Sequence, residues 1–153
     1  MAHFAKLDSN NIVTQVVVVD DKDTNDSNGN EVESIGIAFC QRIIPDGSNW
    51  KQTSYNANFR GNYAGIGFTY MTNVETLGVA STDIFVCQQP HASWGMGKTE
   101  AQWISPLPQP ELTTTQLAMS QGYLWDEEAH QADSATPKTV GWVLSSVHGN
   151  PIL

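Results

Sequence analysis

The first twenty positions of the chain hold two β-rich stretches on either side of a polar cluster. Residues 3–7 alternate in the manner of a strand, residues 8–11 are Asp-Ser-Asn-Asn, and residues 12–19 end in four consecutive valines. Turn-forming residues between two such stretches predict an antiparallel hairpin. The unbroken valines at 16–19 favour a strand that is covered on both faces.

From Asn30 onward the apolar spacing changes to that of a helix. Four large apolar residues recur at helical intervals: Val32, Ile35, Phe39 and Ile43. Asn30 followed by Glu33 has the arrangement of a capping box, and Pro45 ends the pattern. We therefore expect one amphipathic helix of about three turns, lying on the sheet with Phe39 in the core. Gly36 would allow the helix to approach the sheet closely.

Residues 50–70 predict the central part of the sheet. They include six of the fourteen aromatic residues of the chain. Ile66, Phe68 and Tyr70 alternate with smaller or polar residues, which is the period of a strand with one face on a core. We interpret Trp50 as a core residue and residues 56–62 as a structured connection.

Beyond residue 70 the pattern weakens, and short strands and hairpins are predicted. Residues 83–87 form a short apolar run that favours a strand. Two pairs of tryptophans each flank a polar stretch: Trp94 with Trp103, and Trp125 with Trp142. Each pair indicates a hairpin with a tryptophan on each arm, where cross-strand contacts stabilise the pairing. Residues 106–110, Pro-Leu-Pro-Gln-Pro, predict a stiff, extended spacer.

Together these elements predict an α+β fold that is mainly β. Residues 1–72 would form one unit, an antiparallel sheet with a single packed helix. Residues 73–153 would form a β-hairpin-rich part with proline spacers, which packs on the first unit or extends from it. A chain of 153 residues is long enough to bury a substantial core.

Composition and charge narrow the classes of partner. The net charge is −9, and the seven Lys and Arg residues are scattered along the chain. Binding to nucleic acid by counterion release needs clustered cations, so no direct nucleic-acid partner is expected. No stretch approaches the roughly 18 apolar residues of a membrane span, and the first residues lack the order of a signal peptide. We expect a soluble protein that is made in a cytoplasm and has no membrane partner.

The sequence offers no catalytic or metal-binding constellation. The acidic run 20–31 begins like an EF-hand loop, but such a loop needs Gly at its sixth position and Glu at its twelfth. This chain has Asp26 and Val32 there, so a solvated loop is favoured over a looser cation site. Four well-separated histidines argue against zinc. Adjacent acids at 126–128 fit a solvated turn better than a glycosidase pair. We expect no cofactor, no metal and no enzymatic activity.

The two cysteines, Cys40 and Cys87, are interpreted as free thiols. Synthesis in a cytoplasm favours reduced cysteine. Nothing in the sequence brings the two residues together, although a bridge between them stays an open alternative.

Five segments of the first 70 residues stand out together: residues 1–8 (Met-Ala-His-Phe-Ala-Lys-Leu-Asp), 36–41, 50–56, 59–60 and 62–70. They resemble a family of small proteins in marine bacteriophages, carried in particular by cyanophage genomes. Members are mostly uncharacterised or described as virion structural proteins. The resemblance therefore implies a phage particle as the setting and carries no catalytic residue with it.

Two functions follow from this resemblance as hypotheses. The first is a structural accessory protein of the virion, a decoration or cement protein on the exterior of the capsid. Its partners would be the major capsid protein or other virion proteins, with self-association left open. The alternative is a component of the tail or its fibres that contacts a host receptor or glycan.

The segment 88–110 is the candidate protein interface. Its candidate contact residues are Pro90, Trp94, Met96, Trp103, Pro106 and Pro108. The prolines hold the chain extended, which lowers the ordering cost of binding, and the large apolar residues suit the centre of an interface. For Trp94 and Trp103, an interface role and a place in the protein's own core are equally consistent with the sequence.

Overall fold

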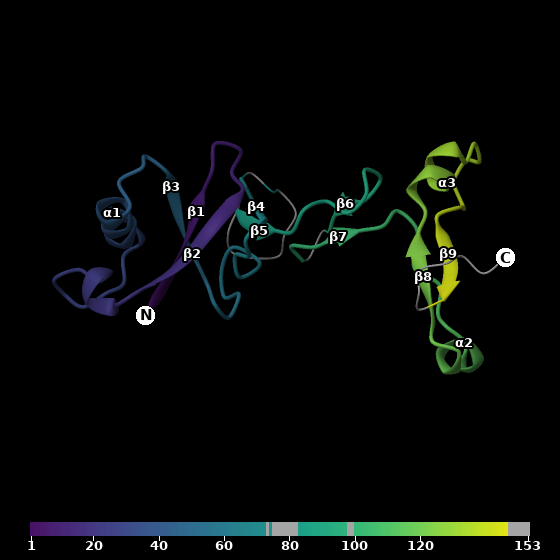
Figure 1. Ribbon diagram of the computed structural model, residues 1–153, viewed down its shortest axis with the longest axis horizontal. Helices are drawn as coiled ribbons and strands as arrows, with labels where there is room; N and C mark the ends of the chain where they lie inside the picture. The colour runs from purple at the N-terminus through teal and green to yellow at the C-terminus, as the bar shows by residue number, and fades with distance from the viewer. Residues whose placement is uncertain (73, 75–82, 98–99, 147–153) are drawn as a thin grey trace. The chain divides into compact units, whose positions relative to one another are not determined.

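The computed structural model of the protein describes residues 1–72, 74, 83–97 and 100–146, and the chain divides into two compact units (Figure 1). The N-terminal unit comprises residues 1–88 and 96–102, and the C-terminal unit comprises residues 89–95 and the chain from Trp103 onward. Small antiparallel sheets predominate, so the fold is α+β and mainly β, as predicted. Within the described residues, no helix has the length and apolar character needed to cross a membrane.

A three-stranded antiparallel sheet forms the centre of the N-terminal unit. Strands β1 (Ala2–Leu7), β2 (Val13–Val19) and β3 (Asn49–Thr53) lie in the order β2-β1-β3. The turn between β1 and β2 is closed by Asp8, whose carboxylate accepts hydrogen bonds from the amides of Asn10 and Ile12 at 2.8 and 2.9 Å. The predicted hairpin is therefore confirmed, and β1 becomes the central strand because β3 pairs with its free edge.

Both faces of this sheet are covered by apolar clusters. On one face, Phe4 and Trp50 pack with Cys40 of helix α1 (Glu33–Ile43). On the other face, Leu7 and Val13 pack with residues that include Phe85. Trp50 is 2% exposed, which confirms its predicted place in the core. A short 3-10 helix, η1 (Asp21–Asp23), precedes α1.

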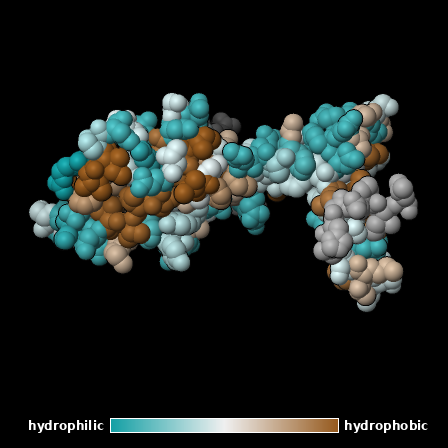
Figure 2. Space-filling model, viewed as in Figure 1, coloured by the Kyte–Doolittle hydropathy of each residue, from teal (hydrophilic) through white to brown (hydrophobic). Residues whose placement is uncertain are grey.

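The valines of β2 are covered less completely than the sequence suggests. Val16 and Val17 are half-buried against the two opposite clusters, and Val19 is buried. Val18, however, is 56% exposed, because β2 is an edge strand and β1 takes the central place. Figure 2 shows a hydrophobic area on one face of this unit, over α1 and β2.

Helix α1 has the predicted length of three turns but a different start and a different buried face. It begins after Val32, which makes no side-chain cap, so the capping box expected at Asn30 is absent. Its buried residues are Gly36 and Cys40, whereas Ile43 is 51% exposed. Phe39 is only half-buried at the edge of the cluster, so its predicted core position is wrong. The helix lies on the sheet through its small residues.

Gly36 is required by the close contact between α1 and β1. A Cβ at this position would lie under 3.0 Å from three ring carbons of the fully buried Phe4. We expect Gly36→Ala to lower the free energy of unfolding by up to about 2 kcal/mol, because an overpacking cost of about 1–3 kcal/mol outweighs the gain of about 1 kcal/mol in helix propensity. Chemical denaturation of the full chain measures this difference. The exposed substitution Ser34→Ala in the same helix is the control, and a Gly36→Ala protein as stable as that control would contradict the close packing.

The strand expected around Ile66 is shorter than predicted and begins later. Strand β4 covers only Thr69–Met71 and pairs antiparallel with β5 (Ile84–Val86), which confirms the predicted strand near residue 85. Gly67 has a φ of +86° and closes a turn that leaves Ile66 76% exposed. Because β4 pairs with β5, the boundary between the units lies at Gln88 and not after residue 72.

Two further hairpins follow, each beside a tryptophan pair. Strands β6 (Gly95–Met96) and β7 (Trp103–Ile104) pair with each other, as do β8 (Gln121–Trp125) and β9 (Trp142–Ser146). In the second hairpin Trp125 lies directly opposite Trp142, as predicted. Helix α2 (Thr114–Ala118), which begins at a capping box of Thr113 and Gln116, precedes β8, and helix α3 (Glu127–Ala132) occupies the connection between β8 and β9.

Candidate functional site

The connection that follows β3 is held in an unusual backbone conformation. Ala57 and Arg60 have φ values of +55° and +56°, and Gly61 follows with a φ of +73°. For residues other than glycine, such a conformation costs on the order of 1–3 kcal/mol and persists only where the surroundings fix it. The contacts of Arg60 supply that fixation.

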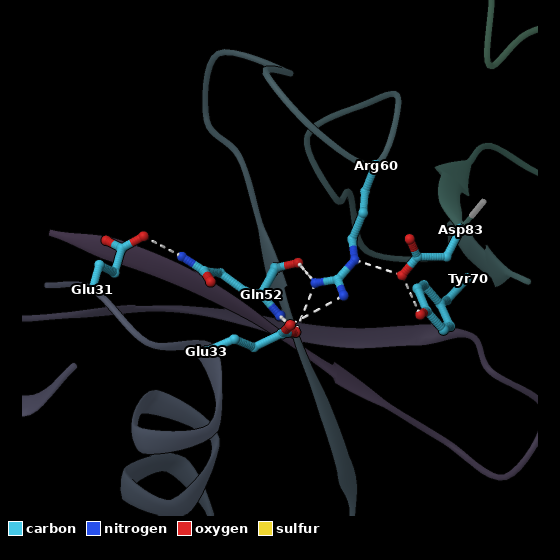
Figure 3. Close-up of polar contacts among 6 residues, drawn as sticks. All are labelled: Glu31, Glu33, Gln52, Arg60, Tyr70 and Asp83. Atoms are coloured by element: carbon cyan, nitrogen blue, oxygen red, sulfur yellow. Dashed lines mark hydrogen bonds and ion pairs between the residues drawn. The ribbon is translucent and has the colours of Figure 1, made fainter. Parts of the chain in front are cut away.

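Arg60 forms the centre of a half-buried polar network (Figure 3). Its guanidinium donates to both carboxylate oxygens of Glu33 at 2.6 and 3.1 Å, to Asp83 at 2.7 Å, and to the backbone carbonyl of Gln52 at 2.8 Å. The Tyr70 hydroxyl donates to the same oxygen of Asp83 at 2.5 Å. One side chain thus ties the loop to the start of α1, to β3, and to the segment that leads into β5.

The network keeps its carboxylates ionised. Burial opposes the charge on Glu33, but the hydrogen bonds from Arg60 and from the Gln52 amide outweigh it and hold the pKa of Glu33 below its ordinary value. Burial likewise opposes the charge on Asp83, and hydrogen bonds from Tyr70 and Arg60 lower its pKa in the same way. Burial and the Asp83 carboxylate together raise the pKa of Tyr70. All three groups therefore keep their ordinary neutral-pH charge states and act as a clamp.

An exposed aromatic platform stands beside this loop. The Tyr55 ring is stacked on His3 with 5.5 Å between ring centroids, and Tyr63 meets it edge-on at 5.3 Å. His3 and Tyr63 contact each other at 5.4 Å, so the three rings form one group. Tyr55 is nevertheless 68% exposed. A large aromatic ring is therefore held in place while much of its surface faces solvent.

A polar cavity of about 220 Å³ adjoins the Tyr55 ring. Its lining includes nine residues with polar or aromatic side chains: His3, Glu31, Gln52, Thr53, Ser54, Tyr55, Asn56, Asn58 and Phe59. The Gln52 side-chain amide donates to Glu31 at 2.6 Å, and the Ser54 hydroxyl accepts from the Asn58 amide at 2.9 Å. The carbonyl of the same Gln52 accepts from Arg60, so the cavity and the Arg60 clamp share a residue. This combination makes the loop the strongest candidate for a binding site.

The residues expected at a protein interface differ in their surroundings. Pro90, Pro106 and Pro108 are exposed, and Met96 and Trp103 are half-buried. The segment around residues 106–110 forms neither helix nor strand, which agrees with its interpretation as an extended spacer. The structure therefore leaves the proline positions accessible.

Trp94 has a different environment from the prolines. Its ring packs against Trp125 and Trp142 with centroid distances of 6.0 and 5.9 Å, and against His91 at 5.4 Å. These contacts lie within the C-terminal unit. Of the two roles left open by the sequence, the contacts favour a place for Trp94 in the protein's own packing.

Glu127 is a structural residue and not part of a solvated acidic turn. Its carboxylate accepts hydrogen bonds from the amide and hydroxyl of Ser93 at 3.0 and 2.5 Å and from the Trp125 indole at 2.8 Å. Hydrogen bonds from Ser93, Gln131 and Trp125 lower its pKa to about 2. The expectation for residues 126–128 is corrected at this position, because Glu127 joins the segment before β6 to the β8–β9 hairpin.

The other candidate chemistry of the sequence forms no site in the described residues. In the acidic run, the Asp26 carboxylate accepts from the amides of Asn28 and Asn30 and closes its own turn. Among residues 1–72, 74, 83–97 and 100–146, no three His, Cys, Asp or Glu side chains gather in a way that could hold a metal. Neither the buried Cys40 nor the exposed Cys87 is in a disulfide bond, and His148 lies outside the described residues.

Arg60 and Tyr55 both lie in the stretch 50–70, but the sequence pattern does not mark either of them as a site residue. One signal for Arg60 is available: it is an isolated cation beside Gly61, in a chain with more than twice as many acidic as basic residues. In such a chain an arginine side chain is expected to form an ion pair with one or more carboxylates. Nothing local predicts which two it meets, because Glu33 and Asp83 lie 27 and 23 positions away.

Searches against family models, curated proteins and solved structures found no match to this chain.

Proposed function

We propose that this protein is an accessory protein of a phage particle that works by binding other protein subunits, as a decoration or cement protein on the capsid exterior. The setting rests on the resemblance of residues 1–70 to small proteins of marine bacteriophages. One structural observation supports the mode of action: the chain around residues 104–110 is exposed at Ile104 and at its prolines, and leaves strand structure after Ile104.

The chemistry of this segment suits a protein partner. Residues 104–110 read Ile-Ser-Pro-Leu-Pro-Gln-Pro and contain no charged side chain, so burying them would desolvate no ion. Prolines restrict the free chain, so less conformational entropy is lost when the segment lies on a partner. Ile104, which is 52% exposed, supplies an apolar anchor.

The neighbouring elements of the C-terminal unit are also incompletely covered. Helix α2 has no buried residue, and three large apolar side chains nearby in the sequence are more than half exposed: Leu117, Met119 and Leu124. Exposed apolar residues that gather in one part of a molecule favour protein association. The exposed apolar residues of α2 and β8 could therefore take part in the proposed protein contact together with residues 104–110.

The proposal predicts that Ile104→Asp will reduce uptake of the protein into phage particles at least tenfold, since an ion would have to be buried at the contact. Particles that lack the protein are mixed with the purified variant, and bound protein is quantified after sedimentation. The melting temperature of the free variant should stay within a few degrees of the wild type, because the side chain is exposed.

The matched control is Ile66→Asp, which places the same charge at a 76% exposed isoleucine of the N-terminal unit. It should bind particles as the wild type does. Equal uptake of Ile104→Asp and wild type would contradict the proposed contact. A label attached to the bound protein and seen on the tail, not the head, would instead support the tail component.

A further inference from the structure

The loop beside Tyr55 has properties that the proposed protein contact does not use. It belongs to the N-terminal unit, and its exposed polar and aromatic groups are the Tyr55 ring and the side-chain amides of Asn56 and Asn58. Strained backbone at Ala57 and Arg60 is held in place by contacts of Arg60 to Glu33 and Asp83. Preorganised loops that present aromatic and amide groups are typical of binding sites.

We propose that the cavity beside Tyr55 binds one neutral sugar unit of a carbohydrate chain. The faces of a pyranose ring carry C–H groups and its edges carry hydroxyls, so a sugar needs an apolar platform next to hydrogen-bonding groups. The exposed Tyr55 ring supplies the platform. Side chains with amide, hydroxyl or carboxylate groups line the adjoining cavity, among them Asn56, Asn58 and Glu31.

The platform is anchored at its other side to the central sheet. Tyr55 stacks on His3, which lies in β1 opposite Thr53 of β3. Tyr63 restrains the ring from a second direction, at an interplanar angle of 68°. A ring that is already immobilised loses little entropy when a ligand stacks on it, which favours binding of a weakly interacting partner such as a sugar.

Size and charge define the class of sugar. A cavity of about 220 Å³ is smaller than the roughly 300–1,000 Å³ of sites for drug-sized ligands, so it suits a single ring of a longer chain. The carboxylate of Glu31 lies in the lining, the α-ammonium of Met1, which also lines the cavity, is paired with Asp21, and the net charge of the chain is −9. The Glu31 carboxylate and the negative net charge repel an acidic sugar, whereas the hydroxyls of a neutral sugar can donate to Glu31 and accept from the amides.

The test uses the full chain in solution, free of any particle, so that its result does not depend on the proposed protein contact. Neutral trisaccharides of glucose, galactose, mannose and N-acetylglucosamine are screened by saturation-transfer NMR. At least one should bind, with a dissociation constant in the millimolar range or tighter. Tyr55→Ala should weaken that binding at least tenfold, whereas Tyr55→Phe, which keeps the stacking face, should stay within about threefold of the wild type.

Ile66→Ala is the matched control, since it truncates another exposed apolar residue of the same unit and should leave binding unchanged. Melting temperatures within a few degrees of the wild type exclude unfolding as the cause of any loss. The proposal is overturned if no trisaccharide binds, or if Tyr55→Ala binds as well as the wild type. Loss of particle uptake in Tyr55→Ala without any sugar binding would also overturn it and identify a protein contact.

Discussion

Replacing Phe4 with alanine is expected to lower the free energy of unfolding by about 3–5 kcal/mol, which is a large part of the stability of a small domain. Phe4 is fully buried on the central strand and packs with Trp50 and Cys40 between the sheet and α1. Its ring also fills the space directly beneath Gly36, so truncation leaves a cavity that the helix cannot close without moving. Urea denaturation of the full chain, followed by far-UV circular dichroism, measures the loss.

Phe39→Ala is the matched control, because it removes the same side chain from the helix on the other side of the contact. Phe39 is half-buried, and Arg42 lies over its ring at 5.1 Å. The expected loss is about 1–2 kcal/mol, well below that of Phe4→Ala. Equal losses for the two variants would show that the face of α1 that carries Phe39 is core, as the apolar spacing alone suggests.

The parts of the fold that the sequence predicts correctly depend on local signals. The β1–β2 hairpin follows from turn residues between two β-rich runs, and in the structure the carboxylate of Asp8 closes that turn. The opposition of Trp125 and Trp142 follows from their positions on two arms of one hairpin. In each case the residues that carry the signal are neighbours along the chain or across one turn.

The predictions that fail involve residues whose partners are distant in sequence. Glu33 was expected to cap its own helix, but its carboxylate accepts from Arg60 and from the amide of Gln52. The helix rotates toward the sheet through Gly36 and Cys40, because only small residues permit so close an approach to Phe4. The close approach at Gly36 is predicted by the sequence and confirmed; the spacing of the large apolar residues does not show that Phe39 lies at the edge of that contact.

The candidate sugar site could not be predicted from the sequence either, because the contacts that shape it join residues that are distant along the chain. Tyr55 belongs to a stretch rich in aromatic residues, and most of those rings serve packing. Its exposure results from the loop conformation at Ala57 and Arg60, which has no signature in the sequence because neither residue favours positive φ. The Arg60 clamp that enforces this conformation depends on two carboxylates from other parts of the chain.

The Arg60 clamp should contribute strongly to stability at neutral pH. We expect Arg60→Met to lower the free energy of unfolding by about 3 kcal/mol, because it leaves Glu33 and Asp83 without their shared cation. This value is at the lower end of the range for breaking a buried ion pair, since the Glu33 side chain is 32% exposed and partly screened by solvent. Lys22→Met is the control: it removes the same charge from an exposed position and should change stability by no more than about 0.5 kcal/mol.

The pH dependence of this difference separates loss of charge pairing from loss of packing. In the folded wild type the pKa values of Glu33 and Asp83 lie below their ordinary values of 4.5 and 3.8. Their contribution to stability is therefore complete above those ordinary values and is lost as the pH falls through the lowered ones. Without Arg60 the two carboxyls protonate more readily, so the gap in unfolding free energy between wild type and Arg60→Met should be largest at pH 7 and shrink markedly by pH 3.

Other carboxylates titrate in both proteins, so their contributions cancel in this difference. Asp46 and Glu127 are examples, with pKa values lowered to about 2 by hydrogen bonds chiefly from Lys6 and Ser93 respectively. Urea denaturation at pH 7, 5 and 3 measures the gap, and a gap that stays constant would mean that Arg60 stabilises the loop through its packing alone.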